Sequence, residues 1–303
     1  MRSADEPVLD VDDIRARYTA RVAASLPRHT ALAARYVNES MPPRWTLEWY
    51  LPWWLGSAVN LDIELRRALV VSNVLGLVSV RLEDDLRDGD VPADDVASAR
   101  ALAPTLFEEA LAVYRTRLPS SARFWAVLDA SMATWRAAAD GPDAPKRGAP
   151  IKVAAYAACE LGGRLDLWPG LDRCLDDTVA ALVHYDQFCD WEADLAAGRW
   201  NAFVAGVSPP VRRPGSVKRN RAAVLTALLT RPVVDEHFAL ITGAAARAAE
   251  QATELELGPL ANYLSGWADQ VAAQGAQITR SYSAVADRVT RLMFGNATGG
   301  ASA

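Results

Sequence analysis

The sequence has few of the residues that build disulfide frameworks or zinc sites. Its 303 residues include three cysteines and three histidines, and no two cysteines have the C-x-x-C spacing. An odd cysteine count without that spacing favours reduced thiols and a cytoplasmic location over a disulfide-bonded protein or a zinc protein. The histidines are isolated in the sequence, and His184 is expected to be a core group or a neighbour of the site.

The sequence also lacks an excess of positive charge and any long apolar run. Its net charge is −5 and its pI is about 5.4, which argues against a nucleic-acid partner because phosphate backbones are bound by basic surfaces. The first residues contain no apolar run of the signal-peptide kind, and no stretch of about 18 apolar residues follows elsewhere. We therefore expect no stable membrane attachment.

Alternating runs typical of β-strands are scarce, whereas apolar residues recur at intervals of three and four. Hydrophobic residues make up 51% of the chain, enough for a large core. The pattern predicts an all-α protein with a single domain from 1 to 303, in which 1–10 and 295–303 are disordered. The expected helices span 14–38, 61–87, 93–117, 120–139, 151–161, 171–197, 221–229, 234–255 and 260–293.

An aromatic cluster follows the helix-breaking pair Pro42-Pro43. It consists of Trp45, Trp49, Tyr50, Trp53 and Trp54, and it surrounds Pro52. Five large rings in ten residues need apolar neighbours, so the cluster is interpreted mainly as packing.

Three aspartates, Asp84, Asp85 and Asp88, follow the apolar segment 68–80. Residues four apart on an α-helix lie on one face, about 6 Å apart, so Asp84 and Asp88 project together and Asp85 lies at the edge. Like charges at this spacing repel, and water or a cation must offset the repulsion. A solvated acidic turn is one interpretation. The other, in which the carboxylates line a pocket, is favoured because the preceding segment is apolar on nearly every face.

A second acidic segment repeats this pattern. Asp186, Asp190 and Asp194 stand at i, i+4 and i+8, and each step rotates only about 40° around the helix. Gln187 lies in the same turn, whereas Glu192 falls on another face and is expected to be solvated. The two segments predict two acidic walls that face each other across a helical cavity.

Carboxylates without accompanying histidine or cysteine favour Mg²⁺ or Mn²⁺ over zinc. Mg²⁺ usually completes its coordination with water and with phosphate oxygens of a ligand, so two carboxylate walls predict a bridging diphosphate. Metal ions there neutralise the charge that develops on a departing diphosphate. The residues therefore predict metal-assisted departure of a diphosphate.

With these segments the sequence resembles the class I isoprenoid-diphosphate enzymes: terpene synthases, trans-prenyltransferases and squalene/phytoene synthases. Asp84-Asp85-x-x-Asp88 resembles their first aspartate-rich motif, D-D-x-x-D. The resemblance covers roughly residues 70–201. It implies an isoprenoid-synthase-type helical bundle around a central active-site cavity, with about three Mg²⁺ ions, or Mn²⁺ instead, held by the six aspartates.

The second segment is similar to three branches of this superfamily. The spacing of Asp186, Asp190 and Asp194 resembles the terpene-synthase triad N/D-x-x-x-S/T-x-x-x-E. Gln187-x-x-Asp190-x-x-x-Asp194 is similar to the prenyltransferase motif Q-x-x-D-D-x-x-D, with Trp191 in place of one aspartate. Asp190-x-x-x-Asp194 followed by Gly198-Arg199 resembles the squalene/phytoene pattern.

Three departures from the family patterns favour a terpene synthase, most like a bacterial diterpene synthase. The G-K-x-x-R stretch of chain-elongating prenyltransferases is replaced by the tryptophan-rich segment 45–54. Their paired arginines after the first motif are replaced by 89–93, and the tyrosine and proline of phytoene synthases are replaced by 200–202. Ten tryptophans suit the stabilisation of a carbocation by aromatic faces.

The resemblance also implies residues that hold the diphosphate. The candidates are Lys152, Arg199, Arg280, Tyr282 and Gln187. The loop 208–220 carries four further basic residues, which are either a lid over the diphosphate or a solubilising surface: Arg212, Arg213, Lys218 and Arg219.

The activity that the resemblance implies is that of a carbon–oxygen lyase, which ionises a prenyl diphosphate and cyclises or deprotonates the carbocation. Gly76 and Ser79, before the first motif, are small and are expected to leave depth for a C15 to C20 chain. A diterpene substrate, linear or already bicyclic, is preferred. The alternatives are a prenyl-condensing enzyme, either trans-prenyltransferase or squalene/phytoene-synthase-like, and a non-catalytic helical protein with solvated acidic faces. A homodimer is compatible with each.

Overall fold

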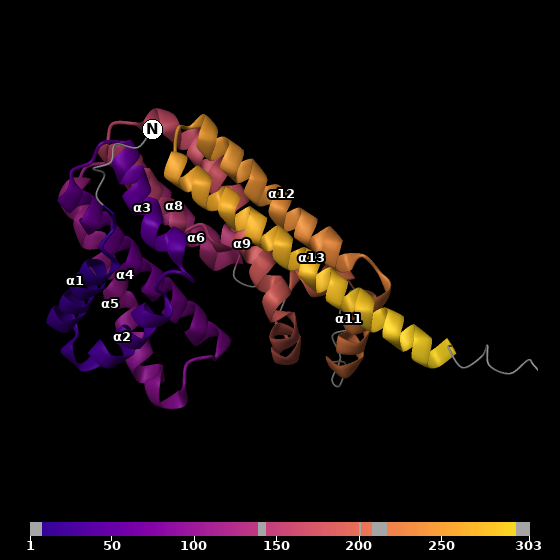
Figure 1. The fold of residues 1–303 in the computed structure, drawn as a ribbon. Coiled ribbons are helices and arrows are strands. Elements are labelled where there is room, and N and C mark those ends of the chain that lie inside the picture. The colour runs from indigo at the N-terminus through magenta and orange to yellow at the C-terminus, as the bar shows by residue number, and fades with distance from the viewer. Residues whose placement is uncertain (1–7, 139–143, 200, 208–216, 295–303) are drawn as a thin grey trace, which may run out of the picture. The chain divides into compact units, whose positions relative to one another are not determined.

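The structure, a computed structural model, describes residues 8–138, 144–199, 201–207 and 217–294. These residues form helices and no strand, so the predicted all-α class is confirmed (Figure 1). The α-helices are α1 (Val11–Ser25), α2 (Thr30–Glu39), α3 (Thr46–Ala58), α4 (Ile63–Asp88), α5 (Val96–Arg117), α6 (Ala122–Ala138), α7 (Ala144–Arg147), α8 (Ile151–Leu161), α9 (Trp168–Ala197), α10 (Ala202–Val207), α11 (Val217–Thr230), α12 (Val233–Glu254) and α13 (Gly258–Phe294). Short 3-10 helices are η1 (Pro27–His29), η2 (Ala93–Asp95) and η3 (Leu165–Leu167).

The chain divides into two compact units, each built from separate stretches of sequence. The first unit comprises Met1–Trp135, Ala149–Asp172 and Glu254–Leu260, and the second comprises Arg136–Gly148, Arg173–Thr253 and Ala261–Ala303. The first acidic segment belongs to the first unit and the second acidic segment to the second. A single domain from 1 to 303, and acidic segments that face each other, both stay predictions.

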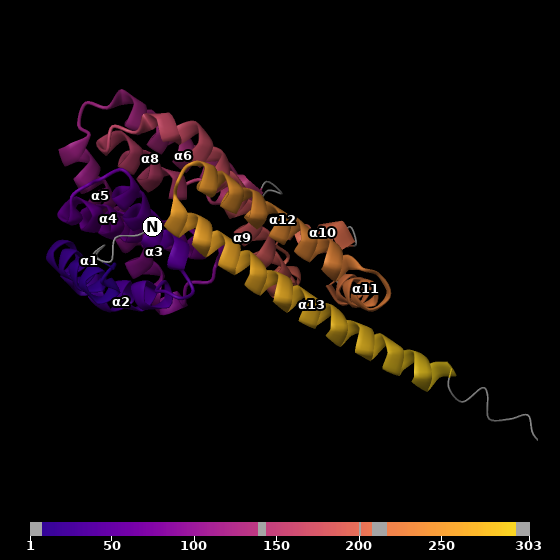
Figure 2. The ribbon, with the colours of Figure 1, turned by 45° about the horizontal axis from the view of Figure 1, so that its top comes forward.

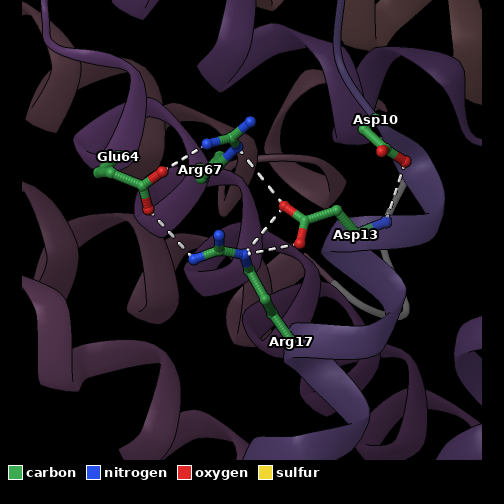
Figure 3. Close-up of polar contacts among 5 residues, drawn as sticks. All are labelled: Asp10, Asp13, Arg17, Glu64 and Arg67. Atoms are coloured by element: carbon green, nitrogen blue, oxygen red, sulfur yellow. Dashed lines mark hydrogen bonds and ion pairs between the residues drawn. The ribbon is translucent and has the colours of Figure 1, made fainter.

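Helix α1 begins at an aspartate cap. The Asp10 carboxylate accepts a hydrogen bond from the Asp13 N–H at 3.0 Å, which satisfies one of the free donors of a helix N-terminus (Figure 3). Asp13 pairs with Arg17 at 2.9 Å, and Arg17 reaches Glu64, in the first turn of α4, at 3.2 Å. Arg67 contacts both Asp13 and Glu64 (Figure 3). The starts of α1 and α4 are thereby joined by a network of ion pairs.

Two predictions for this region are corrected by the structure. Leu9 is buried in the core and Asp10 caps α1, so the expected disorder of 1–10 is wrong for these two residues. Residues 1–7 and 295–303 lie outside the described part of the chain. The helix expected over 14–38 is two helices, because α1 ends at Ser25 and Pro27 begins the separate turn η1.

The tryptophan-rich segment forms α3 in spite of its internal proline. Pro52 has no N–H and leaves the Glu48 carbonyl, four residues earlier, without its helical donor. The side-chain amide of Asn73, on α4, donates to that carbonyl at 2.5 Å and replaces the missing hydrogen bond. Trp49 and Trp53 are buried, which confirms the packing interpretation for these two rings.

Helix α4 forms the centre of the first unit, and it lies beside α5 in both views (Figures 1 and 2). Ser79 Oγ donates to the Ala103 carbonyl of α5 at 2.7 Å. A Cβ placed on Gly76 would lie 3.8 Å from the Ala110 Cβ, also on α5. The small side chains on this part of α4 thus allow close packing against α5. The expectation that Ser79 leaves depth for a substrate is therefore wrong.

The second unit has its own hydrophobic core. Helices α12 and α13 run side by side in both views and pack with α9, α10 and α11 through buried side chains (Figures 1 and 2). Gly275 allows one of these contacts, because a Cβ there would lie 2.5 Å from the Phe238 ring. The core residues include Phe188, Trp191, Leu195, Phe203, Val224, Val234, Phe238, Ile241, Ala245 and Val271.

Candidate functional site

The first acidic segment forms the last turns of α4. Gly89 has a φ of 77°, and the N–H of Asp90 bonds to the Asp85 carbonyl at 2.9 Å. Glycine adopts this left-handed conformation without strain, so the helix ends after Asp88. Carboxylates at a helix C-terminus are destabilised by the helix dipole. Uncompensated carboxylates at this end would therefore be unfavourable.

Two neighbouring side chains hold individual carboxylates of this segment. Arg87 Nη1 lies 2.9 Å from Asp84 Oδ1. The Tyr36 hydroxyl, from α2, donates to Asp85 Oδ2 at 2.7 Å. Asp88 is exposed at the last position of the helix. The three aspartates are therefore in different environments, and Asp85 is held by a side chain from another helix.

Tyr36 and Arg81 lie at the first acidic segment and were missed by the sequence analysis. Tyr36 is 4% exposed, and its burial, followed by the hydrogen bond to Asp85, raises the pKa of the phenol. It therefore keeps its proton and remains a donor. The Arg81 guanidinium lies 5.3 Å from the Tyr36 ring centre and 5.8 Å from that of Trp45, and it pairs with Glu39 at 3.0 Å. No spacing rule relates Tyr36 to a motif on another helix.

The second acidic segment lies along the outer face of α9. Asp186 and Asp190 are exposed, and Asp194 is half-buried. The opposite face of the helix is buried in the core of the second unit through Phe188, Trp191 and Leu195. Glu192 is exposed and pairs with Arg221 at 2.8 Å, which confirms the expectation that it lies off the acidic face.

Helix α9 ends by the same backbone turn as α4. Gly198 has a φ of 73°, and the N–H of Arg199 bonds to the Asp194 carbonyl at 2.8 Å. The turn brings the Arg199 side chain back to the helix, where Nε donates to Asp194 Oδ1 at 3.0 Å. A residue predicted to hold the diphosphate thus pairs with a residue predicted to bind metal.

Asn201 holds the second carboxylate oxygen of Asp194 and was also missed. Its Nδ2 donates to Asp194 Oδ2 and to the Gln187 carbonyl, both at 2.8 Å. Its Oδ1 accepts the Val204 N–H at 3.0 Å and so caps the short helix α10. The available signal was an asparagine directly before the apolar run Ala-Phe-Val-Ala, a typical helix start.

Two of the predicted diphosphate ligands are enclosed by protein. Lys152 Nζ, on α8, lies 2.8 Å from Asp172 Oδ1, and its side chain is 14% exposed. Gln187 is buried, and its Oε1 has no hydrogen-bond partner among the described residues. A buried acceptor without a donor costs about 1–3 kcal/mol. The roles of both residues toward a diphosphate stay predictions.

The remaining predicted ligands lie on α13. Arg280 is exposed, whereas Tyr282 packs against the core of the second unit, and this burial raises the pKa of its phenol. Of the loop residues considered as a lid, Lys218 and Arg219 are exposed at the start of α11, and Arg212 and Arg213 lie outside the described residues.

His184 and His237 form a packed pair. His237 Nε2 donates to the His184 carbonyl at 2.9 Å, and the His237 ring lies 5.0 Å from the Phe203 ring. Burial lowers the pKa of both imidazoles, so they are neutral at pH 7. This environment agrees with the expectation that His184 is a core group.

Comparison with known proteins identifies the architecture. No protein-family model matches the chain, and no curated protein matches its sequence. A solved structure does match, the geranylgeranyl pyrophosphate synthetase from the archaeon Geoglobus acetivorans, with a TM-score of 0.62. The match covers 86% of this chain and 96% of that chain, at 15% sequence identity. The fold is that of the isoprenoid synthases. At this identity the likeness concerns the fold alone.

The isoprenoid-synthase fold carries acidic side chains whose chemistry fits Mg²⁺. They offer oxygen donors, which Mg²⁺ and Mn²⁺ prefer, and the exposed Asp186 and Asp190 suit an ion that keeps several waters. Among the described residues, no group of three or more His, Cys, Asp or Glu side chains is arranged to hold a metal ion. A Mg²⁺ ion bound here would therefore rely on water and phosphate oxygens for much of its coordination. The set of three ions stays a prediction.

Within the described helices, none is both long enough and apolar enough to cross a membrane. The cytoplasmic location and the homodimer stay predictions.

Proposed function

We propose that this protein is a Mg²⁺-dependent enzyme that ionises a prenyl diphosphate. The proposal is carried by one combination: an isoprenoid-synthase fold in which D-D-x-x-D ends α4 and a second acidic face runs along α9. Mg²⁺, when bound, neutralises the charge of the departing diphosphate. The ligands would be Asp84, Asp85, Asp88, Asp186, Asp190 and Asp194.

The basic residues would exchange carboxylate partners for phosphate oxygens. Lys152 is paired with Asp172 and Arg199 with Asp194, so neither contributes an uncompensated charge to the resting protein. A diphosphate carries more charge than a single carboxylate and accepts hydrogen bonds from a guanidinium in bidentate fashion. Arg280, Tyr282 and Gln187 are the further candidates for holding it.

One fate of the carbocation is condensation with a second prenyl diphosphate, which would make the protein a transferase. The fold neighbour supports this fate, since it is a geranylgeranyl pyrophosphate synthetase. Arg81, one turn before the first acidic segment, and Arg87, within it, would be candidates for holding a second diphosphate. Neither arginine stands where the paired arginines of chain-elongating prenyltransferases follow the first motif.

The other fate is cyclisation or deprotonation by a terpene synthase, a lyase acting on a C15 to C20 substrate. Aromatic rings in α3 and directly before it support this fate. Trp45 and Trp54 are only partly buried, and the Tyr50 and Trp54 rings lie 5.4 Å apart. An aromatic face that met the bound substrate would stabilise a carbocation. A diterpene precursor, linear or bicyclic, is the preferred substrate for this fate.

Product analysis tests the proposal and separates the two fates. The protein is incubated with Mg²⁺ and geranyl, farnesyl or geranylgeranyl diphosphate, each with and without isopentenyl diphosphate, and an EDTA-treated sample is the control. Longer prenyl diphosphates formed only with isopentenyl diphosphate identify condensation. Hydrocarbons or alcohols formed without it identify the terpene synthase, and a head-to-head product identifies the squalene/phytoene type. Absence of metal-dependent pyrophosphate release from every substrate contradicts the proposal.

A further inference from the structure

The three aspartates of the second acidic face are not equivalent. Asp186 and Asp190 are exposed, whereas both carboxylate oxygens of Asp194 accept hydrogen bonds from its own unit. Arg199 Nε lies 3.0 Å from Oδ1, and Asn201 Nδ2 lies 2.8 Å from Oδ2. Each carboxylate oxygen has a second lone pair, so Asn201 can stay in place, but a metal ion that recruited Oδ1 would meet the positive charge of Arg199 and compete with it.

The two donors differ in how easily they can be displaced. Asn201 is 3% exposed and neutral, and it is also hydrogen-bonded to the Gln187 carbonyl and the Val204 N–H. Releasing it would expose a buried amide and uncap α10. Arg199 is charged, and its side chain is 32% exposed. A charged group of this kind can exchange its carboxylate partner for the more highly charged diphosphate, whereas the neutral amide of Asn201 gains no such exchange.

We propose that Arg199 acts as a latch on Asp194: it withholds Oδ1 from metal until an anion such as diphosphate draws the guanidinium away. Asn201 is the positioning residue that keeps the carboxylate in place when Arg199 leaves. Metal binding on α9 is thereby coupled to anion binding, and the coupling acts equally in both directions. The inference rests on the proposed function for its view of Asp194 as a metal ligand.

Binding of Mn²⁺ to the substrate-free protein, measured by electron paramagnetic resonance, tests the latch without turnover. Arg199→Gln removes the charged donor and is expected to tighten Mn²⁺ binding roughly fivefold or more. Arg221→Gln is the matched control, because Arg221 pairs with Glu192 on the same helix but off the acidic face. The control is expected to change Mn²⁺ affinity less than about twofold, as surface pairs are weakly coupled to their surroundings.

A second set of variants tests whether the gain in Mn²⁺ affinity depends on Asp194. Adding Asp194→Asn to Arg199→Gln is expected to return Mn²⁺ affinity to the wild-type value. Adding Asn201→Ser instead keeps a residue that can cap α10 but releases the carboxylate, and is expected to lose most of the gain. Metal-free binding of inorganic pyrophosphate, measured by calorimetry in EDTA, is expected to weaken in Arg199→Gln and to recover in part in Arg199→Lys, which restores the charge.

The latch is overturned if Arg199→Gln and Arg221→Gln change Mn²⁺ affinity equally, because net charge alone would then explain the effect. It is also overturned if the gain survives Asp194→Asn. Both arginines are partly exposed, so melting temperatures close to that of the wild type are expected and serve as the folding check. Failure of the proposed function would be a separate result, seen as absence of pyrophosphate release by the wild-type protein. The Mn²⁺ titration does not measure that release.

Discussion

The ends of α4 and α9 share one backbone device. Each helix stops at a left-handed glycine, Gly89 or Gly198, with φ values of 77° and 73°. In each, the next residue donates its N–H to the carbonyl of an aspartate from the acidic segment, to Asp85 at 2.9 Å and to Asp194 at 2.8 Å. The same local sequence pattern, aspartates followed by glycine, thus produces the same helix terminus in the two units.

The side chains around these two aspartates differ. Asp85 is held by the buried, neutral hydroxyl of Tyr36 from another helix, whereas Asp194 is held by Arg199 and Asn201 from its own turn. The buried, neutral phenol of Tyr36 gains little by binding an anion. The partly exposed guanidinium of Arg199 is charged and can exchange its carboxylate partner for a phosphate. Asp85 is therefore held by a contact between two helices, whereas Asp194 is held by residues that directly follow its own helix.

The largest expected effect on activity comes from replacing one predicted metal ligand at the end of each helix, which tests whether both ends bind metal. Asp85→Asn and Asp194→Asn should each lower Mg²⁺-dependent pyrophosphate release by about 10²–10³-fold, the cost typical of losing one stabiliser of developing charge. Asp90→Asn and Glu192→Gln remove neighbouring charges outside the proposed ligand set and should leave the rate within about twofold, as surface changes usually do. Full activity in either ligand variant would break the parallel between the two ends.

A smaller effect on activity is expected from removing the neutral donor to Asp85, the Tyr36 hydroxyl. Tyr36→Phe should reduce activity by about 10–100-fold, the range seen for partners that orient metal ligands, and should raise the Mg²⁺ concentration at half-maximal rate. Tyr18→Phe is the control, since Tyr18 is equally buried in the first unit but donates to the Ala33 carbonyl. If both variants reduce the rate alike without a change in Mg²⁺ dependence, the effect is structural.

Substituting the terminating glycines compares the two backbones directly. Gly89→Ala and Gly198→Ala should each lower the free energy of unfolding by about 1–2 kcal/mol, because alanine is strained at positive φ. Gly206→Ala, in α10, has open space and no positive φ, and should be neutral or stabilising. Denaturant unfolding measures all three. A clear difference between the first two variants would mean that one terminus is not held in the conformation described.

The smallest expected effect concerns buried groups that shift in opposite directions in the two units. Burial raises the pKa of Glu48 to about 7 and lowers that of His237. Between pH 4.5 and about 7 the native protein retains the Glu48 proton and the unfolded chain does not, so this contribution to stability falls as pH rises. For His237 the unfolded chain binds the proton, so stability falls as pH drops below about 6.5.

Glu48→Gln therefore should raise the free energy of unfolding at pH 8 by about 1 kcal/mol, a modest value because the carboxylate keeps some contact with solvent. At pH 4.5 the variant should match the wild type. Thermal unfolding at the two pH values is the measurement, and an equal effect at both would contradict the raised pKa.

Much of the helical pattern could be predicted from the sequence, with misses where proline intervened. The starts and ends of α4, α8 and α9 follow from periodicity, caps and glycines, which act over a few residues. The division into α1 and α2 was missed because Pro27 stands in an otherwise periodic run. Helix α3 is not among the expected helices: it contains Pro52, and the amide of Asn73 that compensates for the missing N–H comes from α4.

The sequence by itself determined which aspartates share a helix face, because the rotation per residue of an α-helix is the same in every protein. It also determined where those helices stop, since only glycine enters the left-handed region without strain. The tertiary structure decided the partner of each side chain: Tyr36 for Asp85, Asp172 for Lys152, and the α5 backbone for Ser79. Contacts of this kind join residues on separate helices, and they depend on how whole helix faces pack rather than on spacing along one of them.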